Sequence, residues 1–317
     1  MCDTERAVRR RRSGTKASPS SEWRSVELPE RGTTWALDRP GPSASAPTVV
    51  LLHGLAATGA LNWQPLIEPL ATRFRVVALD HRGHGRGIRP DEHFTLEDCA
   101  DDVAVLLDVL GVRRAVLVGY SMGGAIAQLT QHRHGHRVAG LVFLATAARF
   151  DVPSASDLLT PIVAEAARYS VGVPVVGHSL VAIHEALRAL AGYDARPWLG
   201  ARYVPAIVLV TSRDRIVQPR LQRKLADAVA EGRTTELRAG HFVAFIDHRE
   251  TAEALRIACD EVATEAGLYL RSWEYLPWRA RRLVRQVRVW RRYRRAGADP
   301  GRPDAGNSDV ASRTGRS

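Results

Sequence analysis

The amino-acid sequence predicts an α/β protein with a doubly wound, mostly parallel sheet. Short apolar runs alternate with longer segments in which apolar residues recur at helical spacing. The runs are apolar at every position, which is typical of parallel strands that are buried on both faces. Glycine and polar residues directly follow several runs, as expected where the strands of an open sheet end at a functional edge.

The amino-terminal half opens with two short strands around a turn at Gly32, at residues 23–28 and 33–37. Continuous apolar runs then predict buried strands at 48–52, 75–79 and 115–118. Helical spacing predicts helices at 61–72, 96–110 and 125–134. The second of these helices has acids in its first turns and Gly111 just past its end, which are typical helix boundaries.

A fourth buried strand at 141–144 is followed by a change of pattern. Residues 147–203 have helical spacing throughout, and we expect two to four helices here as a cap over the active site. Strands at 206–210 and 234–238 and helices at 219–230 and 249–266 then complete the fold. The expected organisation is a disordered basic arm at 1–21, a core at 22–146 and 204–266, the helical cap at 147–203, and a basic amphipathic tail at 267–317.

The formal net charge of +11 is concentrated at the two ends of the chain. Residues 1–21 carry a net +4 and residues 273–317 a net +8, which leaves −1 for the residues between them. Three scattered cysteines do not suit a disulfide framework or a metal cluster. Because we find no signal peptide, membrane span or dinucleotide fingerprint, we expect a cytoplasmic protein that works without a cofactor or metal.

The segment Gly119–Gly124 reads Gly-Tyr-Ser-Met-Gly-Gly between a predicted strand and a predicted helix. This context turns a Gly-x-Ser-x-Gly match into a candidate nucleophile elbow with Ser121 at its tip. The alternative to a catalytic role is that Ser121 packs in the core or binds phosphate in a glycine-rich turn. A serine nucleophile needs a base and a carboxylate, and we look for both further along the chain.

Asp214 and His241 are the candidate acid and base, because each follows the carboxyl end of a predicted strand. Asp151 is the rival acid and His248 the rival base, and we favour Asp214 for its turn context and His241 for the preceding glycine. The backbone N–H groups of Met122 and Leu55 are the expected donors of an oxyanion hole.

These residues together resemble the α/β-hydrolase family, in particular its cap-bearing esterases and lipases. The resemblance covers roughly residues 23–266. It rests on the Ser121 elbow and on four further segments: His53–Gly54, Asp80–Gly85, the turn at Asp214, and Gly240–His241. It implies an eight-stranded sheet, a helical lid and acyl-enzyme chemistry.

The sequence departs from the family at Gly85-Arg86-Gly87, where the family commonly has Gly-x-Ser, and we expect this loop to be structural. Related epoxide hydrolases and haloalkane dehalogenases use an aspartate nucleophile, and Ser121 argues against both.

Other histidines and acids receive structural interpretations. Two histidine groups could suggest a metal site, and we interpret them as solvated side chains without a nearby carboxylate: His81 with His84, and His132, His134 and His136. Asp101, Asp102 and Asp108 are interpreted as the polar side of a helix.

The tail contains nine arginines and no acid between residues 279 and 295, with apolar residues at helical spacing. Such a segment can lie in an anionic membrane interface, and the alternatives are packing on the protein body or a solvated arm. We expect no nucleic-acid partner.

The expected function is hydrolysis of a small hydrophobic carboxylic ester by Ser121, Asp214 and His241, as in a carboxylesterase or a monoacylglycerol-type lipase. The alternatives are a thioester, lactone or C–C bond as substrate, and a receptor-like protein with slow turnover.

Overall fold

The computed structural model describes residues 20–269, apart from 90–92, 169–178, 201–203, 230–232 and 247. The expected basic tail therefore lies almost wholly outside the described residues, as does most of the expected amino-terminal arm. Strand β1 begins at Ser20, three residues before the start of the first predicted strand at residue 23.

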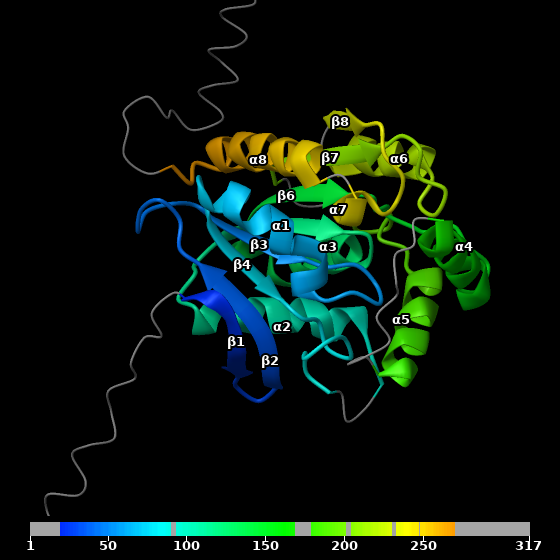
Figure 1. The fold of residues 1–317 in the computed structure, drawn as a ribbon, viewed down its shortest axis with the longest axis horizontal. Helices are drawn as coiled ribbons and strands as arrows, with labels where there is room; N and C mark the ends of the chain where they lie inside the picture. Colours follow the sequence, from blue (N-terminus) through cyan, green and yellow to red (C-terminus); the bar gives the residue numbers. More distant parts are fainter. Residues whose placement is uncertain are drawn as a thin grey trace, which may run out of the picture. The chain divides into compact units, whose positions relative to one another are not determined.

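Eight strands form one sheet in the order β1-β2-β4-β3-β5-β6-β7-β8. The pairs β1/β2 and β2/β4 are antiparallel, and all other pairs are parallel (Figure 1). This confirms the predicted doubly wound, mostly parallel sheet. The strands are β1 (Ser20–Leu28), β2 (Gly32–Arg39), β3 (Thr48–Leu52), β4 (Arg75–Leu79), β5 (Ala115–Tyr120), β6 (Val138–Leu144), β7 (Ala206–Thr211) and β8 (Thr234–Leu237).

The described helices are α1 (Gly59–Ala71), α2 (Leu96–Val109), α3 (Met122–His134), α4 (Ala155–Arg168), α5 (Leu180–Gly192), α6 (Pro219–Val229), α7 (Val243–Ile246) and α8 (His248–Glu265), with a 3₁₀ turn at Gly135–Arg137. Alternate residues of β3 belong to two separate cores. Val50 and Leu52 pack in the core that includes α2, α3 and α6. Val49 and Leu51 pack in the core that includes α1 and α8. Helices therefore cover both faces of the sheet, as uniformly apolar strands require.

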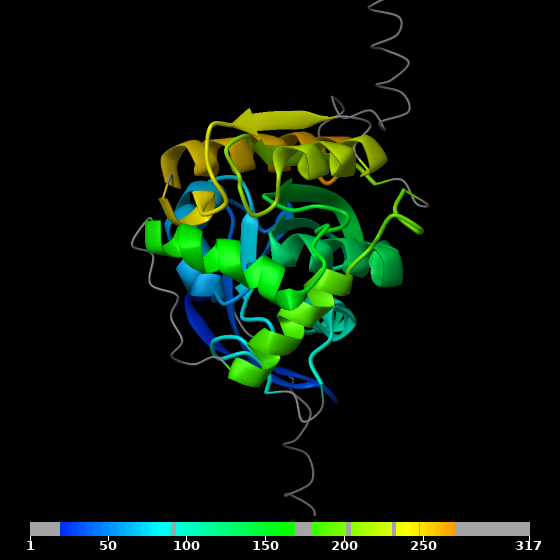
Figure 2. The same ribbon diagram turned by 90° about the vertical axis from the view of Figure 1, so that its right-hand side faces the viewer.

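Helices α4 and α5 lie beyond the edge of the sheet toward which the parallel strands point (Figure 1), and the view from that side shows both helices in front (Figure 2). Both fall within the predicted cap segment. Backbone and side-chain contacts join α5 to the loop after β4. The Ser179 N–H donates to the Gly83 carbonyl over 3.1 Å, and a Cβ on Gly83 would lie 2.4 Å from the Ala182 Cβ.

Helices α3 and α7 differ most from the prediction, whereas α1, α2, α6 and α8 begin and end within two residues of their predicted bounds. Helix α3 begins at Met122 rather than at residue 125, because the elbow leads directly into the helix and its glycines are accommodated by tight packing. The short helix α7 was not predicted, since four residues are too few for a periodic pattern. No helix among the described residues is long and apolar enough to cross a membrane.

The interpretation of His81 and His84 as solvated is wrong, because both are buried, with 2% and 0% exposure. The ring of His53 lies 4.3 Å from that of His81 and 5.5 Å from that of His84. Strand β4 lies between β2 and β3, so the loop after it is enclosed by neighbouring segments. His134 does have a nearby carboxylate, since its Nε2 lies 2.6 Å from Asp101 Oδ1.

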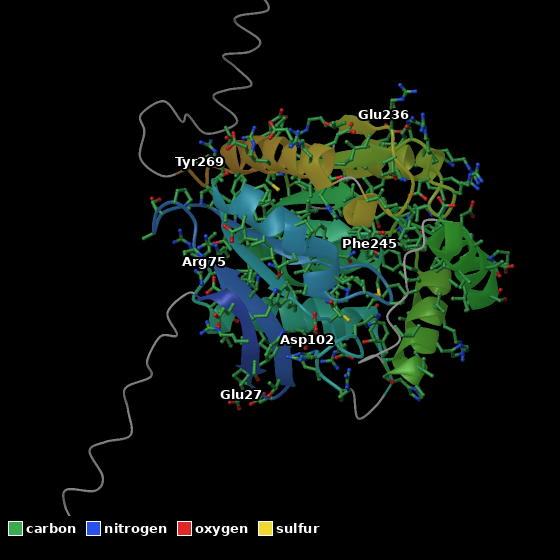
Figure 3. All side chains as sticks on the ribbon, in the orientation of Figure 1. Glu27, Arg75, Asp102, Glu236, Phe245 and Tyr269 are labelled. Carbon is green, nitrogen blue, oxygen red and sulfur yellow. The ribbon has the colours of Figure 1, made fainter. Side chains whose placement is uncertain are left out.

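Asp102 is also not on a polar helix face, because only 2% of it is exposed. Asp102, which is labelled in Figure 3, accepts two hydrogen bonds of 2.8 Å from Arg82 and is paired with Arg31. This buried ion pair joins α2 to the loop after β4 and to the turn between β1 and β2. Arg75, labelled in Figure 3, pairs with Asp38 at the amino-terminal end of β4, away from the cap.

Candidate active site

The turn between β5 and α3 holds Ser121 in a strained backbone conformation, with φ of +51° and ψ of −116°. Glycines make this turn possible. A Cβ on Gly119 would lie 2.5 Å from the Gly123 carbonyl oxygen, and a Cβ on Gly123 would lie 2.1 Å from the Leu52 oxygen. The Thr146 hydroxyl donates a 2.8 Å hydrogen bond to the Ser121 carbonyl, which holds the turn from the neighbouring strand end.

Ser121, His241 and Asp214 form a hydrogen-bonded chain. Ser121 occupies the N-cap position of α3, yet its side chain does not cap the helix. Its Oγ instead lies 3.0 Å from His241 Nε2, and His241 Nδ1 lies 2.8 Å from Asp214 Oδ2. All three residues are buried. The structure thus brings together the three side chains that the sequence predicted for the site.

A set of donors surrounds the carboxylate of Asp214. The backbone N–H groups of Ile216 and Val217 donate to Oδ1 over 2.9 and 2.8 Å. The Thr211 hydroxyl and the Gln222 amide donate to Oδ2 over 2.9 and 3.2 Å. These donors suit an ionised carboxylate, which only accepts hydrogen bonds, and they fix the direction in which it faces the histidine.

Tyr120 connects the elbow to the histidine segment. Its hydroxyl donates a 3.0 Å hydrogen bond to the backbone carbonyl of His241, and the two rings lie 5.5 Å apart. Burial, with a smaller contribution from the charge of Asp214, raises the pKa of Tyr120 well above its usual value. The phenol therefore keeps its proton and remains a donor to this carbonyl.

The two predicted oxyanion donors lie on segments that flank the serine. The N–H groups of Met122 and Leu55 make no hydrogen bond to another described residue. Met122 is the first residue of α3, where the helix has N–H groups without intrahelical partners and a positive dipole end. The loop of Leu55 approaches closely because of Gly54, where a Cβ would lie 2.8 Å from the Tyr120 ring and 3.4 Å from the Ser121 Cβ.

The rival residues do not join this arrangement. Asp151 is partly exposed and lies 3.6 Å from both Arg149 and Arg220, with which it forms ion pairs. His248 begins α8 and has no hydrogen bond to the serine among the described residues.

Sequence reasoning missed several residues that support the site. Asn62, Thr211 and Gln222 are buried polar side chains whose hydrogen bonds go to the oxyanion loop or to the acid. The hydroxyl of Tyr120 was also overlooked, although the residue itself lies inside the motif. The one available signal was a polar residue on an otherwise apolar helix face, as at Asn62 next to Trp63.

Comparisons with known proteins indicate the same fold. The family model described as alpha/beta hydrolase fold matches residues 47–173. "Putative carbamate hydrolase RutD" of Caulobacter sp. (strain K31) is 40% identical over 104 residues, which are 32% of this chain and 38% of that protein. The matched region thus spans well under half the length of this relative.

Solved structures match over a larger part of the chain. The enol-lactonase from Burkholderia xenovorans LB400 is 27% identical, with a TM-score of 0.61, and the match covers 76% of this chain and 100% of that one. A hydrolase from Pseudomonas aeruginosa PA01 is 23% identical, with a TM-score of 0.62, over 75% of this chain and 99% of that one. The sheet order, the elbow after β5 and these matches lead to one conclusion: the chain has the α/β-hydrolase fold.

Proposed function

We propose that this protein is a serine hydrolase that cleaves a carboxylic ester of a hydrophobic substrate through an acyl-enzyme intermediate. The observation that carries the proposal is the hydrogen-bonded chain from Ser121 Oγ through His241 to Asp214, with distances of 3.0 and 2.8 Å. A nucleophile, a base and an acid in this order are the parts that acyl transfer needs.

In the first half of the reaction, Ser121 Oγ attacks the acyl carbonyl carbon while His241 Nε2 takes the hydroxyl proton. The carbonyl electrons move to the oxygen, and the N–H groups of Leu55 and Met122 stabilise this oxyanion. Asp214 holds the imidazolium through Nδ1. The intermediate then collapses, the bond to the alcohol oxygen breaks, and His241 returns its proton to the leaving alcohol.

In the second half, His241 takes a proton from water as the water oxygen attacks the acyl carbon bound to Ser121. The second oxyanion uses the same two N–H groups. Collapse breaks the bond between Ser121 Oγ and the acyl carbon, the serine regains the proton from His241, and the carboxylic acid leaves.

A hydrophobic substrate is supported by the surroundings of the site. The rings of Tyr120 and Phe242 lie 5.5 and 5.9 Å from the His241 ring. Leu55 is partly buried and packs against the core that also includes residues of the cap. Apolar side chains next to the reacting groups favour an apolar acyl or alcohol group and strengthen electrostatic interactions in the site.

A lactone is the second candidate, because the enol-lactonase from Burkholderia xenovorans LB400 aligns with this chain over its whole length. A lactone is a cyclic ester, so the same steps open it and the leaving alcohol stays attached to the acid. Comparing kcat/KM for p-nitrophenyl esters of increasing acyl length with kcat/KM for enol-lactones and alkyl lactones will distinguish the two. A larger value for the lactones would favour the second candidate.

Labelling with a fluorophosphonate tests the proposal directly, because the probe forms a covalent bond only with an activated serine. We expect rapid, stoichiometric labelling of the full chain and none of Ser121→Ala. The control is Ser43→Ala, which removes an exposed serine from the loop between β2 and β3 and should label normally. A wild-type chain that does not label would overturn the proposal and favour a receptor-like protein.

A further inference from the structure

The loop that contains the oxyanion donor Leu55 is fastened by a side chain from helix α1. Asn62 Oδ1 accepts a 3.0 Å hydrogen bond from the N–H of Gly54, the residue directly before Leu55. Asn62 has 0% exposure. Because an N–H can only donate, this contact identifies the oxygen end of the amide as the end facing the loop.

The nitrogen end of the Asn62 amide is in a less favourable environment than the oxygen end. Asn62 Nδ2 is buried and has no hydrogen-bond partner among the described residues. A buried donor without a partner is destabilising. The Nδ2 group of Asn62 therefore lowers the stability of the fold, whereas its Oδ1 atom holds the loop. Within the described part of the chain, the hydrogen bond to Gly54 is the one interaction in which the polar side chain takes part.

Helix α1 gives the asparagine a rigid base. The Thr58 hydroxyl caps the helix by accepting from Leu61 N–H over 3.0 Å, and Asp80 Oδ1 accepts from Gly59 N–H over 2.8 Å. Asn62 lies one turn from this fixed end, and its own N–H donates to the Thr58 carbonyl. The position of its side chain is therefore set by the helix and the core rather than by the loop.

The loop itself needs such a restraint. Ala56, directly after Leu55, has a φ of +51°, which is an unfavourable conformation for a residue with a Cβ. A strained residue persists only where the surrounding contacts determine its conformation. The hydrogen bond to Gly54 acts two residues before this strained position.

We propose that Asn62 is a positioning residue that occupies the Gly54 N–H and thereby aims the neighbouring Leu55 N–H at the oxyanion. Successive amides in this loop then have separate roles, since Gly54 donates to the protein and Leu55 to the substrate. This inference rests on the proposed acyl-transfer function and adds to it a specific source of transition-state stabilisation.

The test compares two variants that each replace a buried amide by an apolar side chain of similar size. Asn62→Leu removes the acceptor for Gly54. Gln128→Met is the matched control: Gln128 is buried, donates one hydrogen bond of 3.1 Å to the Ala147 carbonyl, and has an Oε1 without a partner. It differs from Asn62 in lying on α3, with its hydrogen bond directed to Ala147 rather than to the oxyanion loop.

Three quantities are measured on the full chain: kcat and KM for a p-nitrophenyl ester, the inhibition constant of an alkylboronic acid, and the cooperative unfolding transition. The boronic acid forms a tetrahedral adduct with the serine and puts an oxygen in the oxyanion position. Losing one oxyanion donor typically lowers kcat by about 10² to 10³, and a displaced donor should cost less, about 10- to 100-fold. We expect Asn62→Leu to lower kcat by this factor, weaken the boronic acid similarly, and leave KM within about twofold.

Gln128→Met should keep kcat and boronic-acid affinity within about threefold of the wild-type values, even if both variants lose similar stability. Asn62→Asp keeps an acceptor at the same position, so its kcat should be closer to that of the wild type than the kcat of Asn62→Leu is. If Asn62→Leu does not unfold cooperatively, Asn62→Ala replaces it, because it removes the acceptor without adding volume.

Equal losses of kcat and boronic-acid affinity in Asn62→Leu and Gln128→Met would overturn the role of Asn62, as would a change confined to KM. These outcomes are distinct from failure of the proposed function, which shows as a wild-type chain that neither reacts with fluorophosphonate nor turns over ester.

Discussion

The hydroxyl and the ring of Tyr120 make different contacts, so the positioning role of the hydroxyl can be tested separately from the packing of the ring. It donates to the His241 carbonyl over 3.0 Å, while the ring packs beside Trp63 and Phe245. Tyr120→Phe keeps the ring and removes the hydrogen bond. We expect it to destabilise the fold by about 1 kcal/mol and, because the histidine backbone is released, to lower kcat/KM about fivefold. Steady-state kinetics and urea unfolding measure the two effects.

Tyr193→Phe is the matched control for this prediction. Tyr193 is also buried, and its hydroxyl donates to the Ala125 carbonyl over 3.3 Å, away from the histidine. It should lose a comparable amount of stability with kcat/KM within about twofold of the wild type. A similar drop in kcat/KM in both variants would mean that the effect comes from general destabilisation.

His81 gives the stability of the protein a specific pH dependence. Burial, and then the proximity of His53 and His84, lower the pKa of His81 well below its usual value of 6.5. Below pH 6.5 the unfolded chain therefore binds a proton that the folded protein does not. As the pH is lowered from 6.5 toward the lowered pKa of His81, the free energy of unfolding should decrease by up to about 1.4 kcal/mol for each pH unit.

Urea unfolding at pH 7.5 and pH 5 checks this prediction. Neither ring nitrogen of His81 has a hydrogen-bond partner among the residues that the structure describes, so His81→Leu should fold. This variant should lose less stability between the two pH values than the wild type. The difference should approach about 2 kcal/mol. The control, His136→Leu, removes an exposed histidine and should behave like the wild type. The same pH-dependent loss in all three proteins would contradict the prediction.

The residues that could be predicted were those whose neighbours along the chain define their environment. Ser121, Asp214 and His241 each come shortly after the carboxyl end of a strand, and strand ends of a parallel sheet meet at one edge. The solvated interpretation of His81 and His84 failed because their burial depends on strand order, which places β4 between β2 and β3. Asn62 was missed for a related reason, since its hydrogen bond joins a helix to a loop that precedes it.

At the scale of elements, the close contact between Gly83 and Ala182 determines how the cap helix α5 joins the core. Gly83 has a φ of +72°, and a Cβ there would lie 2.4 Å from the Ala182 Cβ. Gly83→Ala combines backbone strain with this collision. We expect a loss of stability in urea unfolding that exceeds the loss in Gly111→Ala by about 1–3 kcal/mol, which is the typical cost of overpacking. We also expect a change in KM, because α5 lies beyond the edge of the sheet at which the site is formed.

Gly111→Ala is the matched control, since Gly111 has a φ of +64° and no atom of the described part of the chain lies within 4 Å of its Cβ position. It reports the cost of strain alone, about 1–2 kcal/mol. The double variant Gly83→Ala with Ala182→Gly should regain most of the excess loss and the original KM. Equal losses of stability in Gly83→Ala and Gly111→Ala would show that helix α5 moves to accommodate the added methyl group without further loss of stability.

The strands were easier to predict from the sequence than the cap. A buried parallel strand leaves an uninterrupted apolar run, as in β3 and β7, and the chain shows these runs clearly. The cap helices follow no such pattern, because their positions depend on long-range contacts such as Glu185 Oε2 accepting from the Phe94 N–H over 2.7 Å. The segment could be recognised as helical, but its number of helices stayed open between two and four.

On the scale of the whole molecule, the expected catalytic residues and the excess of positive charge lie in different parts of the sequence. Ser121, Asp214, His241 and both expected oxyanion donors lie within residues 55–241, whereas the net charge of +8 at 273–317 lies outside the described residues. We propose that this tail associates peripherally with anionic membranes. The nine arginines between 279 and 295 should each contribute about 1 kcal/mol near such a surface.

Co-sedimentation with vesicles tests this proposal by comparing the full chain with a chain that lacks residues 273–317. We expect the full chain to sediment with vesicles that contain phosphatidylserine and to remain in solution with vesicles of pure phosphatidylcholine. Raising the salt concentration from about 0.1 M to about 1 M should release the chain from the vesicles, because the Debye length falls from about 10 to 3 Å. Deletion of residues 1–19 is the control, because that arm is also basic but has no apolar stripe. Both shortened chains should keep their kcat/KM for a soluble ester, since neither deletion removes a residue of the site. Equal sedimentation with and without residues 273–317 would rule out the tail as the membrane contact.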